Sequence, residues 1–184
     1  MLGGVTVNIL LAIAIYVVML AAWGEQYLPA ANAKFGISVD SLGREIGLRG
    51  GDQILSVDHK AIDDFYSIPK IIILEEAKSI QVQRDGEEVN LPIPEGFIST
   101  LIKQKSPDFI AVRFPFEAGK FTVGSPAQAA GIMVNDKIIG LNDSALVYFD
   151  QFRATIQQYK NKTVQVVLLR GQDTVRVMVN VPAS

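Results

Sequence analysis

Few side chains in this sequence could perform catalysis or bind a metal ion. The chain has one histidine, His59, and no cysteine. Protein zinc sites usually use several nitrogen or sulfur ligands, so a zinc site made only from these residues is not expected. His59 lies in the stretch VDHKA, and we interpret it as a turn residue.

Paired carboxylates could provide general acid–base catalysis. Asp63 and Asp64 are adjacent, and Asp85 precedes a glycine. Helix capping and turn formation explain all three aspartates more simply. Ser125 lies in GSPAQ, which is not the motif of a serine nucleophile, and the single histidine is distant in sequence. We therefore predict no catalytic residue, metal ligand or cofactor in this segment.

The composition is that of a folded chain. Of 184 residues, 49% are hydrophobic and 20% are charged, which argues against intrinsic disorder. The net charge is −2, so no basic excess indicates a nucleic-acid partner. The length suffices for one or two domains.

Residues 1–24 contain no aspartate, glutamate, lysine or arginine. Such a run predicts a transmembrane helix, because about 20 helical residues cross the hydrocarbon core. Trp23 and Tyr27 follow where an interfacial aromatic belt is expected, and Pro29 ends the helix. A cleaved signal peptide would have a charged start and a shorter apolar run, and a buried helix of a soluble protein is the third interpretation. We predict that residues 1–28 form a membrane anchor, whose orientation the charges do not fix.

The rest of the sequence repeats itself with an offset of 84 residues. The stretch SLGREIGLRGGDQILSVDH begins at Ser41, and SPAQAAGIMVNDKIIGLND begins at Ser125. We interpret the match as two copies of one domain, the first repeat over 35–94 and the second repeat over 109–184, joined by a linker over 95–108. Matching pairs include Gly47 with Gly131, Asp52 with Asp136, Ile72 with Ile156, and Val82 with Val166.

Each repeat predicts a strand, a short helix, a strand, a longer helix and a closing hairpin. In the second repeat, Ser125 and Pro126 begin the short helix and Gly131 ends it. The stretches FIAVRF and KFTV are predicted strands ahead of this helix. In the first repeat, Pro69 places the start of the longer helix near Ser67. Gly43 inside the short helix predicts a less stable first repeat.

This order of elements resembles PDZ domains of the bacterial kind, whose pattern SPA…AGL…GD.I…ING is close to SPAQAAGIMVNDKIIGLND. The resemblance implies an α+β fold, with an N-terminal transmembrane helix followed by two PDZ-like domains, each a small β-barrel or sandwich with two helices. It also implies peptide-binding grooves. Their residues would be Phe35, Gly36, Ile37, Val39, Gly119, Lys120, Phe121, Val123, Phe149, Phe152 and Ile156. The alternative is that the aromatic residues at 149 and 152 and Ile156 are core residues.

The whole chain resembles the middle of an RseP-type site-2 protease, an intramembrane zinc metalloprotease. Gly4 to Asn8 matches the family motif G-P-x-x-N, with Val5 in place of proline. The resemblance implies that Gly4 and Asn8 lie near the membrane active site of a parent protein, which would bind zinc through H-E-x-x-H and L-D-G motifs absent from this chain. Asn8 could instead hydrogen-bond a neighbouring helix.

The resemblance implies a regulatory, substrate-filtering segment of a protease of regulated intramembrane proteolysis. Its partners would be the membrane and a protein or peptide substrate, possibly a single-pass membrane protein. The repeats would lie on the periplasmic side of a bacterial inner membrane. Two alternatives remain open at this stage: a non-enzymatic, membrane-anchored adaptor that binds peptides or secretion partners, and the PDZ arm of an HtrA-like serine protease.

Overall fold

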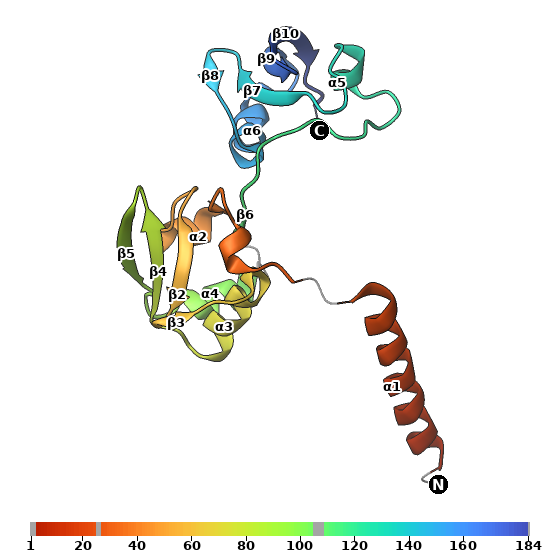
Figure 1. The fold of residues 1–184 in the computed structure, drawn as a ribbon, viewed down its shortest axis with the longest axis vertical. Helices are drawn as coiled ribbons and strands as arrows, with labels where there is room; N and C mark the ends of the chain where they lie inside the picture. The colour runs from red at the N-terminus through yellow and green to blue at the C-terminus, as the bar shows by residue number, and fades with distance from the viewer. Residues whose placement is uncertain (1–2, 25–26, 105–108, 184) are drawn as a thin grey trace.

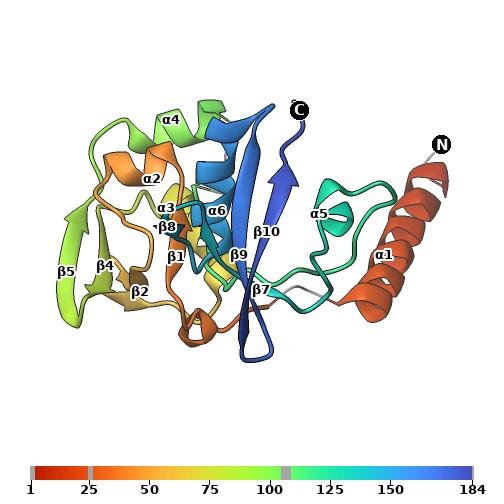
Figure 2. The ribbon, with the colours of Figure 1, turned by 90° about the horizontal axis from the view of Figure 1, so that it is seen from above.

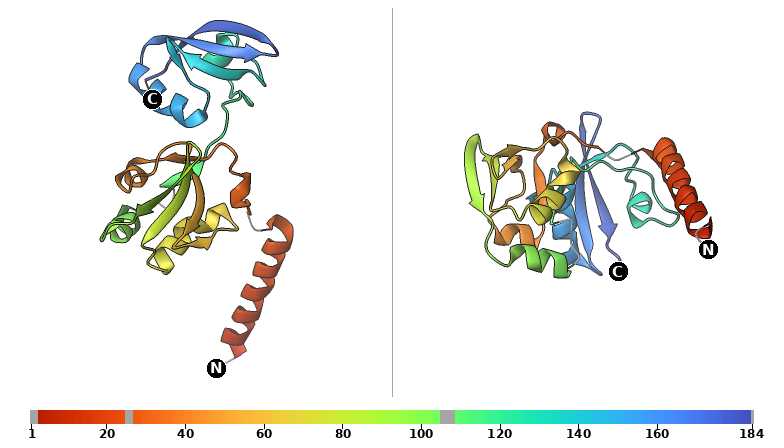
Figure 3. Two further views of the ribbon diagram at one scale, coloured as in Figure 1. Left: turned by 60° about the vertical axis from the view of Figure 1, so that its left-hand side comes forward. Right: turned by 90° about the horizontal axis from the view of Figure 1, so that it is seen from below.

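The computed structural model describes residues 3–24, 27–104 and 109–183 of a mixed α+β protein. Its first element, α1 (Gly3–Trp23), stands clear of both sheets (Figures 1 and 3). None of the residues of this helix is buried against the rest of the described chain. Among the described residues, α1 is the one helix long and apolar enough to cross a membrane.

The first repeat forms a four-stranded antiparallel sheet with the strand order β3-β2-β4-β5, and a separate two-stranded sheet of β1 and β6. Its core buries Ile37, Leu48, Ile72 and Ile80 almost completely. The elements are η1 (Ala30–Asn32), β1 (Ile37–Val39), α2 (Ser41–Glu45), β2 (Gln53–Val57), β3 (Lys60–Ala61), η2 (Phe65–Ser67), α3 (Ile68–Leu74), β4 (Ser79–Arg84), β5 (Glu87–Pro92), α4 (Phe97–Gln104) and β6 (Ile110–Val112).

The second repeat forms a four-stranded antiparallel sheet with the strand order β10-β9-β7-β8. The view from above separates its long hairpin, β9 and β10, from strands β2, β4 and β5 of the first repeat (Figure 2). A second core gathers around Leu141, Val164 and Leu168. The elements are α5 (Pro126–Ala129), β7 (Lys137–Leu141), β8 (Ser144–Ala145), α6 (Phe149–Ile156), η3 (Gln157–Tyr159), β9 (Thr163–Arg170) and β10 (Asp173–Asn180).

Turn and helix-end residues predicted from the sequence take the expected conformations. Gly47 and Gly131 follow the short helices with φ angles of 88° and 91°, which favour glycine. Helix α3 begins after Ser67, and Pro69 lies in its first turn. In contrast, the side chain of Ser125 makes no capping hydrogen bond.

Residues 97–104, predicted as part of a linker, form helix α4 instead. Phe97 and Leu101 are buried in the first core, and the ring of Phe97 meets Phe109 edge-on at 5.7 Å. The apolar residues of FISTLIKQ lie on one side of the helix, so their burial outweighs the punctuation by proline and glycine on which the prediction relied. Residues 105–108 of the predicted linker lie outside the described residues.

The stretch FIAVRF, predicted as a strand of the second repeat, contributes β6 to the first. β6 pairs antiparallel with β1, with Ile37 opposite Val112. Phe109 and Ile110 are buried in the first core. KFTV, also predicted as a strand, has no regular secondary structure, because the bridge to β7 is made earlier, at Glu117.

The offset between the repeats is not constant. Around the short helices it is 84 residues, since Leu48 N–H donates to Gly43 O just as Ile132 N–H donates to Ala127 O. In the closing hairpins it is 86, because Val57 pairs with Ile80 and Leu141 pairs with Val166. Thus Val166 corresponds to Ile80, and not to Val82 as predicted.

Before the short helices the offset is 81 residues. Ile37 exchanges backbone hydrogen bonds with Gly51 and Asp52, and Ala118 exchanges the same bonds with Asn135 and Asp136. Ala118 is therefore the counterpart of Ile37. The predicted equivalence of 35–39 with 119–123 was wrong by three residues, because an insertion precedes α5.

Candidate functional site

An apolar groove of about 810 Å³ lies between α3 and β6 in the first repeat. The helix contributes Ile73 and Leu74, and the strand contributes Ile110 and Val112. Lys70 is the only charged residue that lines it among the described residues. The remaining lining residues are Leu28, Phe65, Tyr66, Pro69, Ala111 and Phe114.

The groove has the parts needed to bind an extended peptide. β6 pairs with β1 along one edge, and within the described residues its other edge pairs with no strand. An added strand could take backbone hydrogen bonds from that edge while its side chains enter the groove beside α3. Leu74 is 70% exposed, so the groove has an apolar rim accessible to a partner.

The predicted groove residues of the first repeat lie elsewhere. Ile37 is fully buried, and Val39 contributes to a different cleft, at the junction with the second repeat. Gly36 has a φ of 73°, and a Cβ there would collide with the backbone of Gly51. Phe35 packs against Tyr148 of the second repeat, with their ring centroids 5.9 Å apart. These residues missed the groove because β6, the strand that does line it, was assigned to the wrong repeat.

In the second repeat the structure gathers four of the predicted residues around a cavity of about 310 Å³. Gly119, Phe121, Phe152 and Ile156 line it. Lys120 and Val123 do not line it, and Val123 is fully exposed. Phe149 also lies outside the cavity, where its ring stacks on Phe114 at 5.4 Å. The remaining lining residues include Phe116, Ala118, Ala127, Ile132, Ile138, Val164, Val166 and Val179.

Both repeats contain a buried aspartate bound by an arginine, which the sequence did not reveal. Asp52 accepts hydrogen bonds of 2.8 Å and 2.7 Å from Arg84, and Asp136 accepts bonds of 2.9 Å and 2.7 Å from Arg170. Each arginine also donates to the carbonyl of the glycine after the short helix. The arginines were missed because they are 86 residues apart, whereas the repeat was matched at 84.

The carboxylate of Asp136 should make the stability of the second core depend on pH. Its pKa is lowered by hydrogen bonds from Arg170, which together with the Met133 N–H bond and the charge of Arg170 outweigh the opposing effect of burial. A lowered pKa contributes stability above the unfolded value, about 4, that is lost as the pH falls through the folded value. We expect unfolding in urea, followed through the amides of β7 and β9, to become easier below about pH 4.

The Asp136→Asn variant should be less stable at pH 7 and lose stability less steeply in acid. Asp143→Asn is the control, because Asp143 is exposed in a turn. Equal acid dependence in wild type and Asp136→Asn would contradict the role assigned to Asp136.

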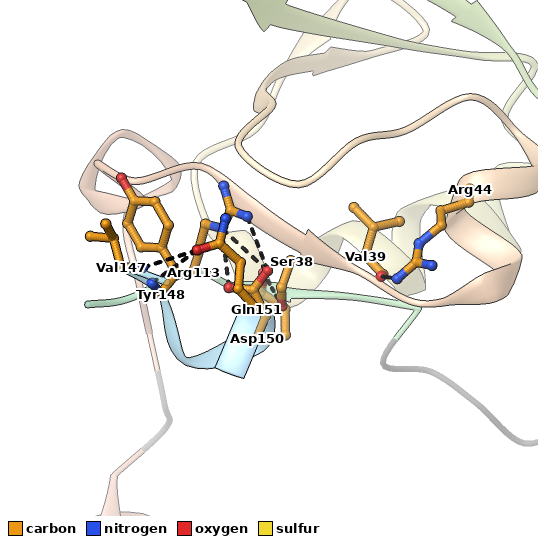
Figure 4. Close-up of polar contacts among 9 residues, drawn as sticks. Ser38, Val39, Arg44, Arg113, Val147, Tyr148, Asp150 and Gln151 are labelled. Atoms are coloured by element: carbon orange, nitrogen blue, oxygen red, sulfur yellow. Dashed lines mark hydrogen bonds and ion pairs between the residues drawn. The ribbon is translucent and has the colours of Figure 1, made fainter. Parts of the chain in front are cut away.

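Arg113 joins the two repeats (Figure 4). Its backbone N–H donates to Gly36 O, and its guanidinium lies against Gly50 and Gly51, where an added Cβ would come within 3.0 Å and 3.1 Å. The guanidinium forms two-pronged hydrogen bonds of 3.1 to 3.3 Å with Asp150 at the start of α6. It also lies 4.3 Å from the ring centroid of Tyr148. One arginine therefore contacts both repeats through backbone, charge and aromatic interactions.

The two residues predicted near a membrane active site, Gly4 and Asn8, lie on exposed positions of α1. Across residues 3–24, 27–104 and 109–183, no group of three or more histidine, cysteine, aspartate or glutamate side chains could hold a metal ion. The donors present therefore do not fit a zinc site.

The chain is similar to a zinc-protease relative. Over 134 residues it is 26% identical to a protein of Rhizobium meliloti (strain 1021) named "Putative zinc metalloprotease". The match covers 72% of this chain but only 33% of the relative. The chain thus spans about a third of the length of the protein it matches. No protein-family model matches it.

Proposed function

We propose that this chain is the membrane-anchored, substrate-docking segment of a zinc metalloprotease of the site-2 type. Its two repeats are PDZ-like units that stand outside a bacterial inner membrane on the periplasmic side. They hold part of a membrane-protein substrate and restrict access to a membrane active site during regulated intramembrane proteolysis. The zinc and the residues that bind it belong to the parent protease.

The observation that carries the proposal is the apolar groove of the first repeat on a chain with an apolar helix. The similarity to a zinc metalloprotease over 134 residues supports the protease connection. Helix α1 supplies an anchor about 30 Å long, which matches the hydrocarbon thickness of a bilayer. The absence of metal-binding groups in the described residues is consistent with a docking role for this segment.

Docking would occur by addition of a strand to β6. The backbone of the substrate would pair with the open edge of β6, and alternate side chains would contact Ile73 and Leu74 of α3. Phe114 lines the same groove and stacks on Phe149 of the second repeat. A bound segment would therefore touch a residue that also contacts α6.

A vesicle flotation assay tests anchoring and docking together. The full chain is reconstituted in liposomes and mixed with a fluorescein-labelled peptide of alternating valine and threonine, flanked by aspartates that complement Lys70. We expect the peptide to float with the vesicles. Leu74→Glu should weaken retention about tenfold, because a charge replaces an apolar contact at the rim.

Two variants make the outcome decisive. Ile102→Glu is the matched control, since Ile102 is an exposed apolar residue of α4 outside the groove, and it should leave retention unchanged. Deletion of 1–24 should leave both protein and peptide unfloated. Equal retention by the Leu74→Glu and Ile102→Glu variants, or flotation of the deletion variant, would contradict the proposal.

A further inference from the structure

The cavity of the second repeat occupies the position of the packed interior of the first. Three lining residues, Ile132, Val166 and Val179, correspond to Leu48, Ile80 and Ile93 under the offsets of 84 and 86 established above. All three counterparts are buried in the first core. The same comparison assigns Ala118, Phe152 and Ile156 to Ile37, Ile68 and Ile72, which are fully buried.

The two longer helices show what this difference means for packing. Ile68 and Ile72 of α3 have no exposed surface, whereas Phe152 and Ile156 of α6 are only partly buried. Helix α6 has no fully buried residue. An apolar face that is closed in one repeat is thus open in the other.

In the first repeat, the segment that follows the hairpin closes this space. Helix α4 and strand β6 bury Phe97, Leu101 and Phe109 in the first core. Phe109 O accepts a hydrogen bond from Asp40 N–H, and a Cβ on Gly43 would lie 2.9 Å from this oxygen. The sequence departure at Gly43 is explained by this close approach. Its counterpart Ala127 carries a Cβ and lines the cavity of the second repeat.

The strand edge beside the cavity is also open. In the first repeat, β1 pairs with β6 along 37–39. The described structure gives the backbone of Gly119, Lys120 and Phe121, the equivalent region of the second repeat, no hydrogen-bond partner. Unpaired strand edges next to an apolar cavity accept an added strand.

We propose that the second repeat binds an extended apolar segment of a protein partner in this cavity, with an aromatic side chain in the position that Phe109 takes in the first repeat. The segment adds beside 119–121, and its β-branched residues cover Phe152 and Ile156. The occupant has the character of this chain's own stretch DFIAVRF. This site is separate from the groove between α3 and β6.

The test uses labelled DFIAVRF and its variant DAIAVRF as probes against the full chain in detergent micelles. Fluorescence anisotropy measures affinity, and NMR follows the methyl groups of Val164, Val166 and Val179. We expect DFIAVRF to bind and shift these methyl signals. Loss of the phenylalanine ring should weaken binding at least about tenfold, because burial of such a side chain supplies much of the affinity.

Two substitutions on α5 locate the site. Ala127→Leu places a larger side chain under the incoming strand and should weaken binding about tenfold. Ala129→Leu is the matched control, because Ala129 is exposed and does not line the cavity. Leu74→Glu should not affect this probe, so failure here and failure of the proposed docking groove are distinguishable.

Three outcomes would overturn the inference. These are absence of binding, equal affinity for the two peptides, and equal effects of the two leucine substitutions. A concentration-dependent dimer that shifts the same methyl signals without peptide would show that a second copy of the chain occupies the cavity instead of a partner.

Discussion

Replacement of Asp52 by alanine should remove about 3–5 kcal/mol from the stability of the first core. Asp52 is 2% exposed, and Arg84, which binds it, has a side chain that is 15% exposed. Removal of the carboxylate leaves a largely buried guanidinium without its counter-charge. It also leaves Arg49 N–H without its acceptor, which is now 2.8 Å away. Because small domains have about 5–15 kcal/mol of stability in total, we expect much of the first core to unfold under mild denaturation.

Urea unfolding monitored by hydrogen exchange of β2 and β4 amides measures this effect. Asp52→Asn should be less damaging, because the amide keeps an acceptor for Arg49 N–H while losing the charge. Glu45→Ala is the control, since Glu45 is an exposed carboxylate near α2, and it should change stability by less than about 0.5 kcal/mol. A loss at Asp52 no greater than at Glu45 would refute the structural role of the ion pair.

Replacement of Arg113 by alanine should release the second repeat from the first while leaving both cores folded. The side chain of Arg113 is 11% exposed and that of Asp150 is 28% exposed, so their pairing is partly shielded from water. With the contact to Tyr148, we expect the substitution to cost about 2–4 kcal/mol of docking free energy. The distance between the repeats should then change from one narrow distribution to a broad one.

Electron–electron spin resonance can measure this distance. The chain has no cysteine, so Glu45→Cys and Asp143→Cys provide two unique sites for spin labels on exposed residues of the two repeats. Arg44→Ala is the matched control, because Arg44 bonds only to Val39 O within the first repeat. The interpretation of Arg113 fails if its substitution leaves the distribution as narrow as the control does.

Local signals in the sequence predicted most elements of the fold. Gly47 and Gly131 mark the ends of short helices, Asp85-Gly86 marks a hairpin, and Pro69 restricts the start of α3. These signals work because each depends on the conformation of one or two residues. Helix α1 was predicted from its length and lack of charge, which again needs no knowledge of tertiary contacts.

Contacts that depend on distant pairing were not predictable in this way. β6 is too short to reveal its partner, and it pairs with β1 across more than half of the first repeat. Its assignment to the second repeat moved the predicted groove to 35–39, whereas the groove lies between α3 and β6. Arg84 and Arg170 escaped notice because a constant offset of 84 pairs Arg84 with Leu168. A comparison that allowed insertions would have brought both arginines, and so both ion pairs, into register.

The connection at Arg113 bears on how such a pair could arise and be inherited. Val112 still pairs with the first repeat, while Phe114 already accepts a hydrogen bond from Phe149 N–H of the second. The stretch that recurs in the sequence and the stretch that folds as a unit therefore have different boundaries. Gene duplication could copy the former, but recombination that moved it alone would leave Phe97, Leu101 and Phe109 behind. Selection would then act on the two repeats as a single heritable block, and exchange between relatives should be tolerated only at breakpoints near residue 113.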